Sequence, residues 1–168
     1  MTERWQGEPK TIADFWRALN ARATGPAIVT TGEADRPEGF LALSATHFCA
    51  SPPVMTVAVG AGTSALGTIE KSRCFSINYL SDQGKWIFDR FASRDVPPGN
   101  RRFAGLELSS LTTGAPILAE TTCVFDCQVE EILERFDTFL LFGRVVAYQC
   151  DTVHHPLVFF SGRALGRG

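Results

Sequence analysis

The stretches TCVFDCQVEEI, Thr122–Ile132, and TFLLFGRVVAYQ, Thr138–Gln149, decide the fold class of this chain. Both are long runs rich in the β-branched and aromatic residues that strands favour. The first run also alternates apolar and polar side chains with the two-residue period of a strand. Its apolar face consists of Cys123, Phe125, Cys127 and Val129. We therefore predict two long strands in a mainly β protein.

Shorter strands are predicted on both sides of these two runs. They are Ala27–Thr31, Gly39–Thr46, Val54–Val59, Cys74–Leu80 and Leu157–Ser161. The polar stretch GEADRPE, residues 32–38, reads as the turn between the first two. Six or more strands joined mostly by short turns indicate a barrel or a sandwich. We expect a barrel, because the strands are long and two of them lack a clean polar face.

Three helices are predicted at the periphery, over Thr11–Ala23, Thr63–Lys71 and Asp82–Ala92. The first opens with Thr11 and Asp14, spaced as in a capping box, and carries one apolar stripe. The stretch 93–113 reads as an irregular loop, which in a domain of this size is usually functional or mobile. We expect one domain over residues 1–168, with the helix of residues 1–25 packed on the barrel.

Composition narrows the range of partners. The chain has 168 residues, a formal net charge of −2 and a pI near 5.9, so no basic field favours nucleic acid. No apolar run approaches the roughly 18 residues of a membrane span. The polar N-terminus MTERWQGEPK is not a secretory signal. We therefore predict a cytoplasmic protein without a membrane or nucleic-acid partner.

The reactive side chains do not form a recognisable catalytic set. Five cysteines without an export signal argue against a disulfide framework, and we interpret them mainly as small core residues. The spacing Cys123-x-x-x-Cys127 matches neither a zinc knuckle nor a redox dithiol. No GxSxG motif or nucleophile–base pair is present. We assign no catalytic residue and no metal ligand, and expect any reactivity to come from a cofactor.

Three segments could hold such a cofactor. Leu43–Pro53 brings small and hydroxyl residues to the end of a strand, where a flat ring can approach the backbone; a plain strand end with a turn is the alternative. Gly60–Ser64 opens a helix whose N-terminus suits a phosphate, although an ordinary N-cap has the same composition. Arg90 lies four residues after Trp86 and could reach a phosphate, or remain a surface charge.

Taken together, these segments resemble the flavin reductase-like family, and the resemblance covers about Ala27–Arg163. The matching pieces come in the family's order. They are Gly39–Thr46 with Ser51-Pro52-Pro53, Thr63–Ile69, the F-x-x-N-x-L run Phe75–Leu80, Arg90-Phe91, Gly143-Arg144-Val145 and Pro156–Arg163. The resemblance implies an FMN-binding split β-barrel, antiparallel and of Greek-key type, with a few peripheral helices. It also implies a homodimer.

The resemblance further implies an NAD(P)H:flavin oxidoreductase. Such an enzyme binds FMN or FAD, takes electrons from NADH or NADPH and supplies reduced flavin to a flavin-dependent monooxygenase. Carried over to this sequence, it places the flavin ring near Ser44, Ala45 and Thr46, lined by Cys49 and Ala50. The phosphate falls near Ser64 and Arg90.

This sequence departs from the family at one motif. Many members carry G-D-H shortly before G-R-V, and its histidine is associated with nicotinamide binding. Here the matching residues are Phe136, Asp137 and Thr138. Two alternatives therefore stay open. One is a flavoprotein that retains FMN and acts on another substrate, and the other is a flavin-binding module without catalysis.

Overall fold

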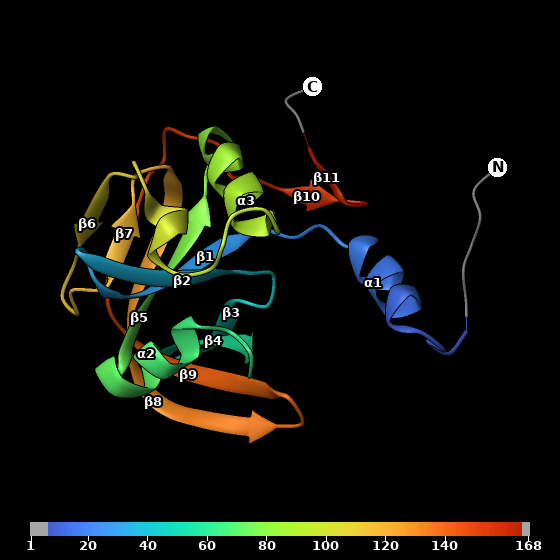
Figure 1. Cartoon of the computed structure of the whole chain (residues 1–168), viewed down its shortest axis with the longest axis horizontal. Coiled ribbons are helices and arrows are strands. Elements are labelled where there is room, and N and C mark those ends of the chain that lie inside the picture. Colours follow the sequence, from blue (N-terminus) through green and yellow to red (C-terminus); the bar gives the residue numbers. More distant parts are fainter. Residues whose placement is uncertain (1–6, 166–168) are drawn as a thin grey trace.

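One seven-stranded antiparallel sheet forms most of the computed structural model, which describes residues 7–165 (Figure 1). Its strands are β1 (Ala27–Glu33), β2 (Arg36–Ala42), β3 (Thr46–Ala50), β4 (Pro53–Gly60), β5 (Cys74–Leu80), β8 (Thr121–Arg135) and β9 (Thr138–Cys150). They pair in the order β2-β1-β5-β8-β9-β4-β3. The two longest, β8 and β9, form a hairpin near the centre. The predicted mainly β, antiparallel fold is confirmed.

The sheet curls around one hydrophobic core. Six of its strands, all except β3, contribute buried side chains to this cluster, among them Val29, Val57, Phe75 and Leu141. The helix α2 (Ala65–Ser72) adds Leu66 and Ile69 to the same core. Within residues 7–165 no ladder joins the two edge strands, β2 and β3. The barrel expected from the sequence is therefore a curled sheet whose core is completed by a helix.

A second core lies on the outer face of β1 and β5, under the helix α3 (Lys85–Ala92). It contains Ile28, Leu80, Ile87, Phe91, Phe103, Leu118 and Leu157. Phe103 comes from the predicted irregular stretch, in the 3₁₀ turn Asn100–Phe103, and packs edge-on against Phe91. A small two-stranded sheet, β6 (Leu108–Ser110) with β7 (Pro116–Leu118), follows this turn. Neither strand was predicted: β6 lies in the stretch interpreted as an irregular loop, and β7 is a proline followed by only two apolar residues, which carry no readable period.

The buried amide of Asn78 attaches β7 to the sheet. Its Nδ2 donates to the Ile28 carbonyl at 3.0 Å and to the Thr30 hydroxyl at 2.9 Å, while its Oδ1 accepts from the Leu118 N–H at 3.0 Å. An amide can satisfy donors and acceptors of two elements at once. This explains why a buried asparagine stands in β5.

Two strand predictions were wrong in detail. The expected turn over 32–38 is only Ala34-Asp35, because Glu33 pairs with Arg36 and Gly32 with Pro37. Gly32 takes a φ of +83°, and Pro37 lies on an edge strand, where a missing N–H is tolerated. The strand expected over Gly39–Thr46 is two strands. β2 leaves β1 at Ala42, and β3 begins on β4 at Thr46.

The chain ends lie beside the sheet. The helix α1 (Ile12–Asn20) starts with the predicted capping box of Thr11 and Asp14, and ends before the Ala23 expected from the sequence. It stands apart from the sheet, and Ile12, Phe15 and Trp16 are 78%, 51% and 50% exposed (Figure 1). Its apolar stripe was expected to pack on the barrel, but in the single chain α1 has no buried residue. Residues 1–6 of the predicted N-terminal segment lie outside the described residues.

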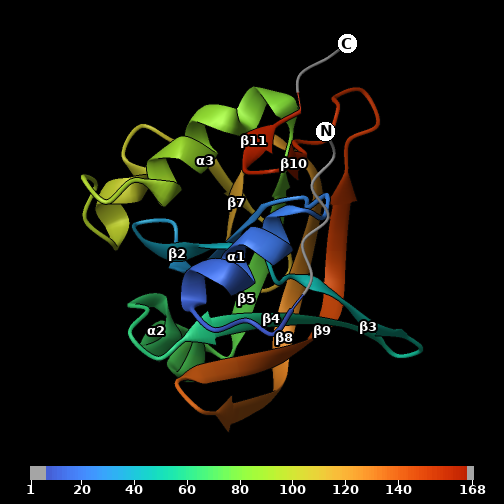
Figure 2. The same ribbon diagram turned by 90° about the vertical axis from the view of Figure 1, so that its right-hand side faces the viewer.

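The predicted last strand, Leu157–Ser161, does not join the main sheet. Only β10 (Phe159–Phe160) is a strand, and it pairs with β11 (Arg163–Ala164) as a small hairpin. Ser161 and Gly162 both have positive φ, which turns the chain back at this point. The Thr24 and Phe159 backbones exchange two hydrogen bonds of 2.9 Å, so this hairpin lies beside the end of α1 (Figure 2).

Candidate functional site

The segment Leu43–Ala45 crosses from one ladder of the sheet to another. The β1–β2 ladder ends at Ala27 and Ala42, and the β3–β4 ladder begins at Thr46. The hydroxyl of Ser44 then accepts from the Ala58 N–H at 3.1 Å and donates to the Ala58 carbonyl at 3.2 Å. Ser44 and Thr46 are exposed, whereas Ala45 packs against the main core. The backbone here is held against β4 and still open to a ligand.

The same strand connects this segment to the predicted phosphate turn. β4 continues for two residues beyond Ala58 and ends at Gly60. The Thr63 N–H then donates to the Gly60 carbonyl at 3.0 Å, which closes a turn before α2. Ser64 is exposed in this turn and makes no side-chain capping bond. A Cβ added at Gly62 would meet nothing within 4 Å, so the turn has open space on that side. The predicted ring and phosphate segments are therefore both attached to the end of β4.

The residues that replace the family's G-D-H motif lie beside the predicted phosphate turn. Phe136 and Asp137 form the turn of the β8–β9 hairpin, and the Ala61 N–H donates to the Asp137 carbonyl at 2.9 Å. Thr138 pairs with Gly60 in the ladder. Phe136 has a φ of +56° and is 92% exposed. An aromatic side chain in the left-handed conformation that suits glycine thus projects beside the candidate phosphate turn.

Cys49 and Ala50 line a different hollow. Past a register shift in β3, they border a cavity of about 540 Å³ between β3 and β9. Its lining also includes His47, Met55, Phe125 and Tyr148. The Cys49 thiol donates to the Pro52 carbonyl at 3.0 Å, which ties it to the proline corner. Both residues belong to the predicted ring segment Leu43–Pro53, but they lie at its far end from Ser44.

Arg90 is not brought together with Ser64. Its guanidinium donates to the Ala104 carbonyl at 2.7 Å and lies 5.0 Å from the centre of the Trp86 ring. These contacts attach α3 to the turn that follows Asn100–Phe103. In both views α2 and α3 lie on opposite sides of β2 (Figures 1 and 2). In the single chain Arg90 therefore positions the loop that follows Asn100–Phe103.

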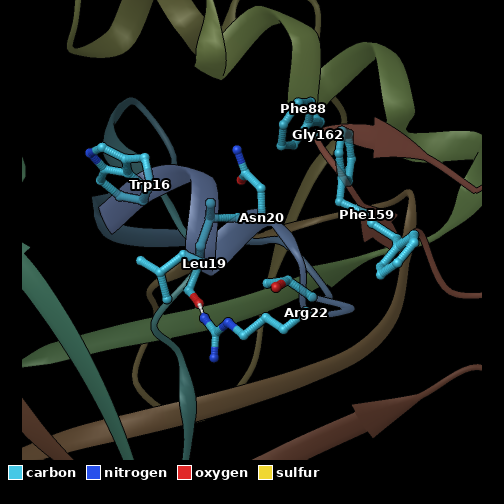
Figure 3. Close-up of a pocket in the computed structure, with 10 residues that line it drawn as sticks. Trp16, Leu19, Asn20, Arg22, Phe88, Phe159 and Gly162 are labelled. Atoms are coloured by element: carbon cyan, nitrogen blue, oxygen red, sulfur yellow. Dashed lines mark hydrogen bonds between the residues drawn. The ribbon is translucent and has the colours of Figure 1, made fainter. Parts of the chain in front are cut away.

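An aromatic cavity that sequence analysis missed adjoins the Ser44 segment (Figure 3). It measures about 220 Å³ and lies between the end of α1, α3 and the β10–β11 hairpin. The rings of Phe88 and Phe159 stack in it, 4.2 Å apart. Arg22, its one charged lining residue, donates to the Leu43 carbonyl at 3.2 Å (Figure 3). Two residues of the predicted apolar stripe, Trp16 and Leu19, line this cavity, but only the fold brings them together with Phe88 and Phe159.

The site offers hydroxyl groups, backbone N–H groups and aromatic rings, with Arg22 and His47 at its edges. Among residues 7–165 no three histidine, cysteine, aspartate or glutamate side chains gather as metal ligands. In that same part of the chain no helix is long and apolar enough to span a membrane. The donors fit a polar flat ring and a phosphate, because N–H and hydroxyl groups match ring carbonyls and phosphate oxygens.

Comparisons with known proteins identify the family of this chain. Residues 19–166 match the family described as the flavin reductase like domain. The reductase subunit HsaB of a flavin-dependent monooxygenase from Rhodococcus jostii is 29% identical, over 90% of this chain and 76% of that protein. The NADH-dependent FMN reductase RutF from Bradyrhizobium diazoefficiens is 30% identical, over 90% and 82%. The chain therefore belongs to the flavin reductase-like family.

A solved structure supports the fold independently. The NADH:FAD oxidoreductase of Streptomyces globisporus superposes with a TM-score of 0.88, covering 99% of each chain at 23% identity. At that identity the likeness concerns the fold alone.

Proposed function

We propose that this chain is an NAD(P)H:flavin oxidoreductase that supplies reduced FMN or FAD to a partner flavin-dependent monooxygenase. The observation that carries the proposal is the continuity of Ser44–Thr46 with Gly60–Ser64 through β4, fixed by the two hydrogen bonds between Ser44 and Ala58. A flavin needs a ring site and a phosphate site on one surface, and this strand provides both. The family membership and the reductases similar to this chain support the same activity.

The residues act by positioning. Ser44, Ala45 and Thr46 present backbone and hydroxyl groups to the ring, with Cys49 and Ala50 at the far end of β3, which begins at Thr46. Ser64 and the N-terminus of α2 hold the phosphate, where the helix dipole favours an anion. Arg90 supports this surface indirectly, through the loop that it holds. The bound flavin supplies the redox chemistry by accepting a hydride from a reduced nicotinamide.

The aromatic cavity receives a second flat group beside the flavin ring. Phe88 and Phe159 offer stacked ring faces, and Arg22 brings a positive charge to its edge. Holding two rings in contact is the main task of a protein that promotes hydride transfer, because orientation lowers the entropic part of the barrier. The exclusion of water by these rings protects the same contact.

A homodimer is part of the proposal, with the cytoplasm as its location. The exposed stripe of Ile12, Phe15 and Trp16 is apolar surface that a second copy of the chain would cover. Light scattering should therefore give twice the monomer mass. Replacing Ile12 and Phe15 with serine should shift the protein toward the monomer, whereas replacing the exposed Val153 with serine should not.

The decisive experiment is to mix the purified protein with FMN and NADH, then NADPH, and follow nicotinamide absorbance in air. Ser64→Ala should weaken flavin binding roughly 10- to 100-fold, because a lost hydrogen bond to a charged group costs about 1.5–3 kcal/mol. Ser110→Ala, an exposed serine on β6, is the matched control and should bind as the parent does. Equal affinity in both variants would remove Ser64 from the phosphate site.

A second function is favoured by one observation. Phe136 and Thr138 replace the family's glycine and histidine beside the phosphate turn, so nicotinamide binding lacks its usual group. A flavoprotein that retains FMN and acts on another substrate would fit this change. Steady-state kinetics separate the two functions, because a reductase turns over added free flavin and a tight flavoprotein does not. Flavin that binds but is reduced by neither nicotinamide would indicate a binding module.

A further inference from the structure

Cys123 and Cys150 face each other across the ends of β8 and β9. They are directly opposite in the ladder, and their sulfur atoms lie 3.4 Å apart. The other three thiols each donate to a backbone carbonyl instead: Cys49 to Pro52, Cys74 to Thr113 and Cys127 to Phe125. The five cysteines were interpreted mainly as core residues, and this holds for Cys127, which is buried. It is wrong for Cys150, which is exposed, while Cys123 is half-buried.

The ladder places this pair where a disulfide fits. The Asp151 N–H donates to the Thr122 carbonyl at 2.8 Å, which means that Cys123 and Cys150 form a non-hydrogen-bonded pair. The Cα atoms of such pairs are about 4.5 Å apart, inside the 4.4–6.8 Å range of disulfides. The sulfur atoms must approach by little more than about 1 Å to reach the roughly 2.0 Å bond length. Side-chain rotation can achieve this without moving either strand.

The two thiols differ in access. Burial and the hydrogen bond with Cys150 raise the pKa of Cys123 to about 12, so Cys123 remains a thiol at neutral pH. Cys150 is exposed at the end of β9 and meets a dissolved oxidant first. An accessible cysteine beside a shielded partner is the arrangement of a thiol that is oxidised and then resolved.

We propose that Cys123 and Cys150 form a reversible oxidative modification site, which peroxides convert to an intrachain disulfide. The peroxide first oxidises the Cys150 thiol to a sulfenic acid and leaves as water. The Cys123 sulfur then bonds to the Cys150 sulfur, and the sulfenic hydroxyl leaves with the Cys123 proton as a second water. In sum, two thiols and one hydrogen peroxide give one disulfide and two waters, and an added dithiol reverses the change.

The site is separate from the part of the candidate flavin site that contains Ser44 and Ser64. On one face of the β8–β9 ladder, the pair Phe125 and Tyr148 lies next to Cys123 and Cys150 and lines the cavity that also contains Cys49. Ser44 lies between β2 and β3, and Ser64 lies between β4 and α2. The disulfide proposal therefore does not rest on the proposed function, and either can fail while the other stands.

The test uses the full-length protein, reduced, freed of reductant and treated with hydrogen peroxide. The titratable thiols under denaturing conditions should fall from five to three, with an intact mass lower by two hydrogen atoms. Trypsin cuts after Arg135 and Arg144, so Cys123 and Cys150 fall on different peptides that the bond should join. Fragment spectra of the joined peptides should place the bond at Cys123 rather than Cys127. Dithiothreitol should restore all five thiols.

Two variants complete the test. Cys150→Ser should keep four thiols after peroxide and give no joined peptides, whereas Cys74→Ser, the matched control, should lose two of its four. Unchanged thiols in the parent protein, a bond to another cysteine, a bond between chains, or oxygen added to Cys150 without a bond would each overturn the proposal. If Cys150→Ser does not fold, the peptide map of the parent protein decides alone.

Discussion

The hydroxyl of Ser44 is hydrogen-bonded in both directions to Ala58, accepting from its N–H at 3.1 Å and donating to its carbonyl at 3.2 Å. A side chain thus takes the place of a backbone partner at the point where the chain passes from β2 to β3. The contact fixes the candidate ring segment on the strand that leads to the phosphate turn. Serine is suited to this position because its hydroxyl donates and accepts at once.

Replacing Ser44 with alanine should remove both bonds at this crossing. We expect the free energy of unfolding to fall by about 1 kcal/mol, since each bond is exposed and a net bond contributes about 0.5–1.5 kcal/mol. Flavin affinity should fall as well, because the ring segment loses its anchor. Urea unfolding and FMN fluorescence titration measure the two effects. Ser44→Thr, which keeps the hydroxyl, should lie closer to the parent protein; equal losses in both variants would contradict the role of the hydrogen bonds.

Gly143→Ala should destabilise the protein strongly. A Cβ at Gly143 would press on the ring of Phe75 and lie 2.8 Å from the Cβ of Cys127, both in the main core. Overpacking of this kind costs about 1–3 kcal/mol. Gly67→Ala in α2 is the matched control: its Cβ meets nothing within 4 Å, and alanine should stabilise the helix by roughly 0.5–1 kcal/mol. The midpoint temperature of thermal unfolding should fall for Gly143→Ala and rise for Gly67→Ala. Shifts in the same direction would refute the packing argument.

Restoring the family motif should improve nicotinamide binding. In the double variant Phe136→Gly and Thr138→His, a histidine able to carry a positive charge stands beside Gly60. We expect KM for the nicotinamide to fall roughly tenfold with a smaller change in kcat, as for one hydrogen bond to a charged group. Phe136→Gly alone removes the bulk but adds no donor. If both variants show the same KM, the histidine is not the missing group.

The pair of His154 and Asp151 should make stability depend weakly on pH. The hydrogen bond from the His154 ring to Asp151, at 2.5 Å, raises the pKa of His154 above its ordinary value of 6.5. The charged pair therefore contributes its stability below about pH 6.5 and loses it as pH rises through the folded pKa. NMR titration of the His154 ring should show the raised pKa, and Asp151→Asn should lower it. An identical titration in both proteins would exclude Asp151 as the cause.

Local pattern was sufficient for much of the fold. The period of two in Cys74–Leu80 predicted β5 with the observed bounds, and the spacing of Thr11 and Asp14 predicted the cap of α1. Both depend on residues only a few positions apart, so sequence contains the full signal. The resemblance of ordered motifs likewise identified the family. Strand ends were less readable, since the lengths of β2 and β3 depend on which partner offers a backbone donor.

What the sequence by itself determined is the class of fold and the family. Tertiary structure alone decided that Arg90 holds a loop, that Phe88 and Phe159 meet across the chain, and that Cys123 faces Cys150. The last pair is separated by 27 positions, and its contact depends on the register of β8 against β9. Register follows from how a whole sheet packs its core, because a slip of one residue would turn every side chain to the opposite face.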